Sequence, residues 1–121
     1  MPYANIPGAR LWFKETSRHV NTVVFIHAAS GTSDSWGLQE PAFIEAGYRC
    51  VAYDRKNWGR SESITQAGSG ADDLEALARY LGLDRFHLVC SALGGIIGLD
   101  YTVESVSYTH LRAHETSLHL V

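Results

Sequence analysis

One stretch decides the fold of this 121-residue chain: Phe86-His87-Leu88-Val89-Cys90-Ser91-Ala92-Leu93-Gly94-Gly95. Residues 86–89 are mostly apolar and predict a short buried strand. A glycine pair follows after a brief turn, and the apolar residues up to about 103 predict a helix. A strand that turns sharply into a helix is typical of α/β proteins.

The rest of the chain repeats this alternation of strand and helix. Pro7-Gly8 marks a turn between the two arms of a predicted N-terminal hairpin. Continuous apolar runs predict buried strands, and apolar residues at helical spacing predict helices. The predicted segments are hairpin arms 3–6 and 10–15, strands 23–26, 48–53 and 86–89, and helices 36–46, 71–81 and about 93–103. This order predicts an α/β fold, with a mostly parallel sheet and helices on both faces.

Composition and charge exclude several classes of function. Hydrophobic residues make up 45% of the chain and charged residues 19%, which predicts a globular domain rather than a disordered chain. The net charge of -3 offers no basic surface for nucleic acid, and no apolar run reaches the roughly 20 residues of a membrane helix. The N-terminus lacks the features of a signal peptide, so we expect a cytoplasmic protein. Two cysteines alone cannot form a four-ligand zinc site, and we expect neither a metal nor a cofactor.

Three motifs in a fixed order carry a resemblance to a known family. The first is the strand and loop Val24-Phe25-Ile26-His27-Ala28-Ala29, and the second is the polar turn Asp54-Arg55-Lys56-Asn57-Trp58-Gly59-Arg60-Ser61. The third is the turn within residues 88–95. Together they resemble the oxyanion loop, the Asp-x-Arg-Gly-x-Gly-x-Ser turn and the nucleophile elbow of the α/β-hydrolase fold family. The resemblance covers about residues 3–104 and implies the N-terminal half of such a domain.

The resemblance implies where a site would lie. It places strand 23–26 between strands 48–53 and 86–89, so the chain reverses its winding direction at that strand. Ligands of such sheets bind beyond the carboxyl ends of the strands at the reversal. Because strand 23–26 would separate Cys50 from Cys90, we expect no disulfide between them.

The predicted elbow departs from the family pattern at its central residue. In the G-x-S-x-G pattern the serine is the nucleophile, and Ala92 occupies that position here. A methyl group cannot attack a carbonyl, so we expect no acyl-enzyme. Ser91 is no substitute, because adjacent side chains point in different directions. Cys90 would face the core. It also replaces the first glycine of the pattern, and its bulk predicts a relaxed elbow backbone.

The resemblance also implies roles for three residues around Ala92. The backbone N–H groups of Ala29 and Leu93 would form an oxyanion hole, and each would contribute on the order of 3 kcal/mol to a lower barrier. His27 would support the loop rather than act as a base. The general base and its acidic partner would lie beyond residue 104.

Two classes of function follow from these residues. The first is a hydrolase-like enzyme acting on an ester, acyl or carbon–carbon substrate, with Ala92 at the nucleophile position. The family also includes cofactor-free oxygenases, in which a His–Asp pair does the main work. The second class is a pseudoenzyme that binds a small molecule without acyl transfer. A histidine and an acid in later strands would favour chemistry, and their absence would favour binding.

The C-terminal segment has a different character. The stretch Val106-Ser107-Tyr108-Thr109-His110-Leu111-Arg112-Ala113-His114-Glu115-Thr116 resembles translated sequencing-adapter DNA. We therefore expect a truncated domain over residues 1–104 and a non-native tail over residues 105–121 that has no place in the fold. Strand 86–89 would then be an unprotected, apolar edge that promotes aggregation.

Overall fold

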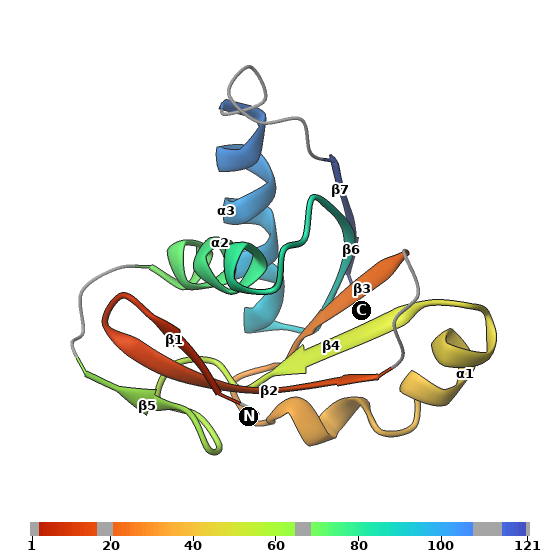
Figure 1. The fold of residues 1–121 in the computed structure, drawn as a ribbon, viewed down its shortest axis with the longest axis horizontal. Coiled ribbons are helices and arrows are strands. Elements are labelled where there is room, and N and C mark those ends of the chain that lie inside the picture. The colour runs from red at the N-terminus through yellow and green to blue at the C-terminus, as the bar shows by residue number, and fades with distance from the viewer. Residues whose placement is uncertain (1–2, 17–20, 65–68, 108–114, 121) are drawn as a thin grey trace.

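The computed structural model describes residues 3–16, 21–64, 69–107 and 115–120, and these residues form a seven-stranded sheet with helices on both faces (Figure 1). The strand order is β1-β2-β4-β3-β6-β7, and β5 pairs with β2. The strands are β1 (Tyr3–Ile6), β2 (Ala9–Thr16), β3 (Thr22–Ile26), β4 (Arg49–Tyr53), β5 (Glu62–Ser63), β6 (Arg85–Cys90) and β7 (Glu115–Leu120). The helices are η1 (Ser33–Trp36), α1 (Glu40–Glu45), α2 (Gly70–Tyr80) and α3 (Leu93–Ser107).

The sheet is mixed, and its parallel part begins at β4. β2 is antiparallel to both β1 and β4, whereas β4, β3, β6 and β7 run parallel to one another. The predicted α/β fold with its N-terminal hairpin is confirmed, and β3 lies between β4 and β6 as expected. In the register of β3 with β6, Ile26 lies opposite Cys90. The carboxyl ends of these two strands are therefore neighbours, which brings the segments that follow them together.

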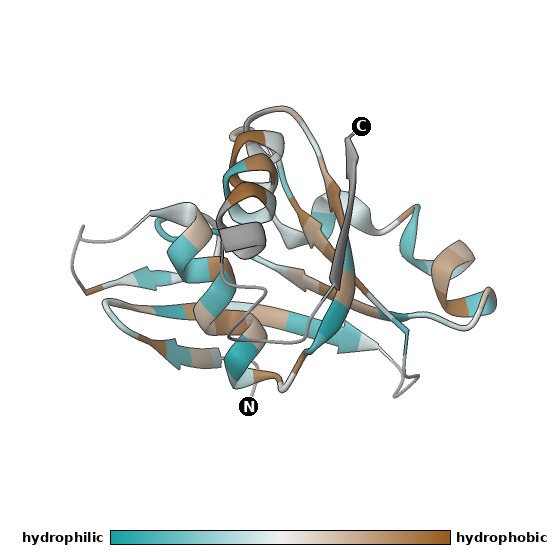
Figure 2. Ribbon diagram, turned by 90° about the horizontal axis from the view of Figure 1, so that it is seen from above, coloured by the Kyte–Doolittle hydropathy of each residue, from teal (hydrophilic) through white to brown (hydrophobic). Residues whose placement is uncertain are grey.

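The central strands divide the core into two layers, because successive side chains alternate between the faces of a sheet. On β3, Ile26 packs into the layer beneath α2 and α3, and Phe25 packs against Trp36 in the layer beneath η1 and α1. The same alternation holds on β4, where Tyr53 faces the first layer and Ala52 the second. Figure 2 shows apolar residues along these central strands and along α3.

The two cysteines lie in different layers. Cys50 packs beneath α1, whereas Cys90 packs beneath α2 and α3. Both are free thiols, so the prediction that they form no disulfide is confirmed. Burial raises the pKa of the Cys90 thiol to about 12, and this residue is therefore an uncharged packing residue.

The helix expected over residues 36–46 differs in the structure from the sequence prediction. The structure instead has two short helices, η1 and α1. Pro41 lies in the first turn of α1, the only part of a helix where proline fits without a clash or a lost hydrogen bond. The helix therefore begins at Glu40. The chain before it forms η1, which Thr32 caps together with Ser35.

Part of the C-terminal segment has a place in the sheet, contrary to expectation. α3 continues to Ser107, and β7 pairs in parallel along the whole of β6, from Arg85 opposite Glu115 to Cys90 opposite Leu120. The expectation that residues 105–121 have no place in the fold is therefore wrong for residues 115–120. The physical reason is the open edge of β6, whose unpaired backbone groups accept an extended segment that α3 returns to it. In this structure β6 is not an edge strand.

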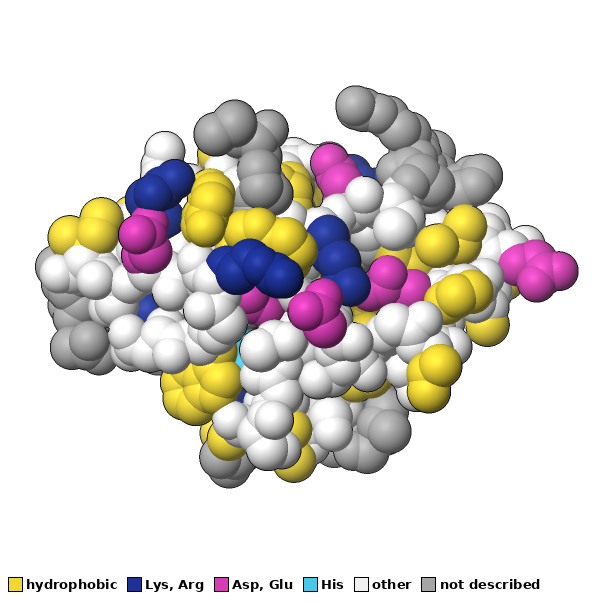
Figure 3. All heavy atoms as spheres, turned by 90° about the horizontal axis from the view of Figure 1, so that it is seen from below, with side chains coloured by type: hydrophobic (Ala, Val, Ile, Leu, Met, Phe, Trp, Pro, Cys, Tyr) yellow, Lys and Arg dark blue, Asp and Glu magenta, His cyan; other side chains and the backbone are white. Residues whose placement is uncertain are grey.

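Charged side chains on the η1 side are paired with one another. Lys14 of β2 lies 3.5 Å from Asp34 of η1 and 3.4 Å from Glu40 of α1, and Arg60 lies 3.8 Å from Asp34. Figure 3 shows this side of the molecule, with basic and acidic side chains next to one another. Within the described ranges, no helix is long and apolar enough to span a membrane.

Candidate active site

The turn between β6 and α3 has the backbone geometry of a nucleophile elbow. Ala92 lies within this turn with a φ of 49°, in the left-handed region that costs a non-glycine residue about 1–2 kcal/mol. It is exposed to solvent. The expectation of a relaxed elbow is therefore wrong. Cys90 is fully buried in the layer beneath α2 and α3, so its bulk does not enter the turn.

Close contact between α3 and the end of β3 imposes this turn. A Cβ atom on Gly94 would lie 2.7 Å from the carbonyl oxygens of both Ile26 and His27, so only glycine fits there. The N–H of Ser91 donates to the Ile26 carbonyl at 3.2 Å, and the N–H of Gly94 donates to the Ser91 carbonyl at 2.8 Å. Backbone contacts thus hold the elbow against β3.

The start of α3 leaves one backbone donor beside Ala92. The N–H of Gly95 donates to the Ala92 carbonyl at 2.9 Å. The N–H groups of Gly94 and Gly95 are therefore both used in hydrogen bonds at the start of the helix. Leu93 begins the helix, and the first N–H groups of a helix have no acceptor within it. The N–H of Leu93 is therefore a donor that α3 does not use.

His27 anchors the loop that follows β3. Its side chain is fully buried; Nε2 accepts a hydrogen bond from the Arg55 N–H at 3.0 Å, and Nδ1 lies 2.6 Å from the Ala28 carbonyl oxygen. Because Nε2 accepts, the proton is on Nδ1 and is donated to Ala28. Burial lowers the pKa of His27, the hydrogen bond to Ala28 opposes this shift, and the charge of Arg55 adds to it. Both ring nitrogens are engaged, so this imidazole has no nitrogen free for proton transfer.

The same contacts orient the Ala29 N–H. The Ala28 carbonyl also accepts a hydrogen bond from the Gly31 N–H at 3.0 Å. Since the peptide joining Ala28 to Ala29 is planar, holding its carbonyl fixes the direction of its N–H. The indole Nε1 of Trp58 donates to the Ala29 carbonyl at 2.6 Å and holds the next peptide as well.

Asp54 ties the loop after β4 to the start of η1. Its buried carboxylate accepts hydrogen bonds from the Ser33 N–H at 2.7 Å and from the Arg60 N–H at 2.9 Å. The Ser61 hydroxyl donates a hydrogen bond of 2.6 Å to the backbone carbonyl of Asp54. Gly59 has a φ of 52°, and a Cβ there would lie 2.3 Å from the Asp54 carboxylate. The aspartate, glycine and serine of this motif therefore hold one another in place.

The four residues predicted from sequence lie on two neighbouring segments. Ala92 and Leu93 follow β6, and His27 and Ala29 follow β3. His87 of β6 lies elsewhere, against an apolar cavity of about 490 Å³ beside Trp36 in the opposite layer. Among the described residues, no group of three potential metal ligands is close enough to hold an ion.

Sequence reasoning missed several features of the loop after β4. Asn57 has a φ of 75°, and asparagine tolerates this conformation better than most residues. The signal was present, since Asn57 occupies the position of the first glycine in the resembled turn. Lys56 and Asp73 form an ion pair of 3.6 Å whose side chains are only 10% and 8% exposed. No sequence pattern pointed to that pair, because it joins a loop to the first turn of α2.

This sheet order, with an elbow after β6 and a loop of small residues after β3, defines the α/β-hydrolase class of fold. The model of the alpha/beta hydrolase family matches residues 23–117, a span that extends into the C-terminal segment. The chain belongs to this family.

Curated relatives and solved structures agree with that assignment. A 2-hydroxy-6-oxononadienedioate/2-hydroxy-6-oxononatrienedioate hydrolase of Paraburkholderia phymatum is 32% identical over 71% of this chain and 32% of its own length. A hydrolase of the same name from Escherichia coli is 28% identical over 78% of this chain and 35% of its own. The chain thus spans about a third of the length of these relatives. The structure of a Vigna radiata epoxide hydrolase mutant has a TM-score of 0.76 and 28% identity over 86% of this chain and 34% of that one.

Proposed function

We propose that this chain is part of a hydrolase-like protein that binds a carbonyl compound at the elbow without forming an acyl-enzyme. The substrate class is an ester, acyl or carbon–carbon compound, and its carbonyl oxygen accepts hydrogen bonds from the N–H groups of Leu93 and Ala29. The observation that carries the proposal is the left-handed backbone of Ala92: the elbow geometry is present and the nucleophile is not.

The donors are supported by backbone structure that does not depend on a serine. Leu93 lies at the start of α3, and the peptide that carries the Ala29 N–H is held at its carbonyl by His27 and Gly31. Donors held in advance stabilise a developing oxyanion without reorganisation. A site of this kind binds a carbonyl oxygen and retains modest catalysis after its nucleophile is lost.

The names of the curated relatives support a more specific substrate class. They describe hydrolases of compounds that carry an oxo group and two carboxylates. For this chain we propose a keto acid of that general kind. A pseudoenzyme that only binds such a compound is the second candidate, and the methyl group of Ala92 favours it, because no covalent intermediate can form there.

Amide NMR of the 121-residue chain tests the proposal. Titration with acetophenone, a neutral ketone that stays unhydrated in water, is expected to shift the amide signals of Leu93 and Ala29, and intact mass is expected to show no adduct. A fluorophosphonate is likewise expected to leave the chain unlabelled. Unmoved Leu93 and Ala29 signals at saturating ketone, or labelling of Ser91, would refute the proposal.

A further inference from the structure

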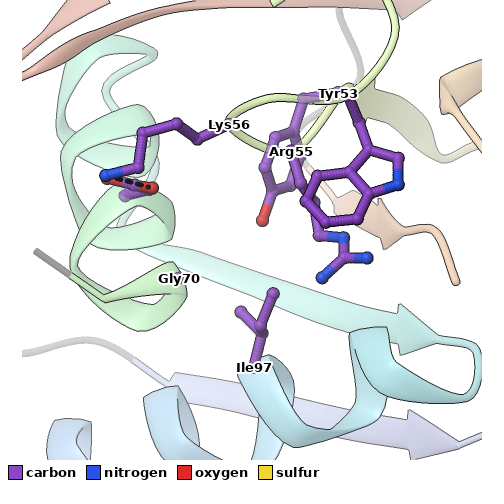
Figure 4. A pocket seen from close by; sticks show the side chains of 7 residues that line it. Tyr53, Arg55, Lys56, Gly70 and Ile97 are labelled. Atoms are coloured by element: carbon purple, nitrogen blue, oxygen red, sulfur yellow. Dashed lines mark ion pairs between the residues drawn. The ribbon is translucent and has the colours of Figure 1, made fainter. Parts of the chain in front are cut away.

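A second pocket lies between the end of β4, the start of α2 and the first half of α3 (Figure 4). Its volume is about 170 Å³. For comparison, a cavity of about 150 Å³ accommodates benzene. The residues that line it are Tyr53, Arg55, Lys56, Trp58, Gly70, Asp73 and Ile97.

The charges around this pocket leave one cation uncompensated. Lys56 and Asp73 neutralise each other in their ion pair. Arg55 forms no ion pair within the described part of the chain, and its guanidinium stacks on the Trp58 ring at 4.5 Å. Arginine remains protonated under ordinary conditions, so the described lining residues carry a net positive charge.

Two nitrogens of this guanidinium have no hydrogen-bond partner among the residues that the structure describes. Nε and Nη2 of Arg55 are both buried, and neither donates to an acceptor among the described residues. Buried donors of this kind are rare in folded proteins and are usually satisfied by a water, an ion or a ligand. Nε and Nη2 lie on the same side of the guanidinium, so their N–H bonds run parallel and match the two oxygens of one carboxylate.

We propose that this pocket binds the carboxylate of a small organic acid, with Arg55 as its anchor. Because both nitrogens are buried, the guanidinium turns about its terminal torsions to meet the carboxylate. The hydrocarbon part of the acid lies against Ile97 and Trp58. Lys56 stays with Asp73 and does not compete for the ligand.

Two residues that line the pocket also contact the loop after β3. The backbone N–H of Arg55 donates to His27, and the Trp58 indole donates to Ala29, so both residues touch the loop proposed to bind the carbonyl oxygen. Ile97 lies on the helix that begins at Leu93. If the proposed function holds, Arg55 binds the carboxylate of the same keto acid whose carbonyl lies at the elbow. Only this step rests on the proposed function.

NMR titration of the 121-residue chain with butyrate tests the pocket directly, because butyrate has a carboxylate and no ketone. The side-chain Nε signal of Arg55 is expected to shift and saturate with butyrate, and to stay unmoved with butyramide, its neutral analogue. Inorganic phosphate is expected to bind at least several-fold more weakly, since it lacks the hydrocarbon part. An unmoved Arg55 signal, or equal binding of butyramide or phosphate, would overturn the carboxylate assignment.

Variants provide a second readout. Arg55→Gln is expected to weaken butyrate binding about ten-fold or more, because it removes a bidentate, charge-assisted contact. Arg79→Gln is the matched control, since Arg79 is an exposed arginine near the end of α2, and it is expected to bind butyrate unchanged. If Arg55→Gln does not fold, the Arg55 signal of the unmodified chain decides the question. A shift of Arg55 with butyrate but none of Leu93 with the ketone would retain the pocket and refute the proposed function.

Discussion

The backbone N–H of Arg55 donates a hydrogen bond of 3.0 Å to Nε2 of His27. This bond joins the loop after β4 to the loop after β3. This bond requires an imidazole whose Nε2 carries no proton, because a protonated Nε2 is a donor and cannot accept a hydrogen bond from the Arg55 N–H. The position of both loops therefore depends on the protonation state of one buried side chain.

Stability is predicted to fall as the pH drops below about 6.5, the usual pKa of an exposed histidine. Burial lowers the pKa of His27, so the unfolded chain takes up its proton at a higher pH than the folded chain. The contribution of neutral His27 to the free energy of unfolding is complete above the pKa of the unfolded chain and is lost progressively below it. Urea unfolding between about pH 7.5 and about pH 5 measures this slope, and His27→Asn is expected to flatten it. An identical slope in the variant would contradict the assignment.

Gly94→Ala is predicted to destabilise the chain by about 2–3 kcal/mol. Its Cβ would lie 2.7 Å from two backbone carbonyl oxygens, which cannot move without separating α3 from β3. Urea unfolding measures the loss. The control is Gly37→Ala, where φ is -59° and the nearest atom would be 3.5 Å away, so little or no loss is expected. Equal stability of the two variants would show that the close contact is absent.

Ala92→Gly is predicted to leave the free energy of unfolding unchanged or to raise it by up to about 1 kcal/mol. Glycine adopts the left-handed conformation of this position without strain, which offsets its greater freedom in the unfolded chain. Ala76→Gly in the middle of α2 is the control and is expected to lose about 1 kcal/mol. A similar loss at position 92 would mean that Ala92 is not left-handed in solution.

Ala92→Ser is predicted to restore a nucleophile where a longer form of the protein supplies a histidine within reach. The hydroxyl would be placed on a backbone that already has the elbow geometry. An activated ester is then expected to give a burst of acyl-enzyme, and a fluorophosphonate to label position 92. The form with Ala92 is expected to do neither. Labelling of both forms at Ser91 would be incompatible with this prediction.

Residues 105–121 are predicted to be foreign to the source gene, although part of this segment pairs with β6. Their resemblance to adapter DNA is independent of structure, and an open strand edge accepts extended segments of many sequences. Sequencing the source locus settles the point. Finding the same residues in frame would show that β7 is native.

The central sheet was predictable because it depends on long apolar runs and on the order of three motifs. β3 lies between β4 and β6 for that reason. The split between η1 and α1 was not predicted, since a single proline decides where the helix begins. β7 was not predicted, because strand pairing depends on the free edge that it meets rather than on its own pattern. The Arg55 pocket combines the end of a strand, a loop and two helices, a juxtaposition that no local pattern encodes.

The contact between Gly94 and the end of β3 also bears on how this protein can change over generations. The backbone of the elbow is imposed by the packing of Gly94 and not by the side chain at position 92, so a change from serine to alanine there leaves no structural damage to repair. Every alanine codon becomes a serine codon by a single change at its first base. A lineage carrying Ala92 therefore stays one point mutation away from a correctly placed hydroxyl.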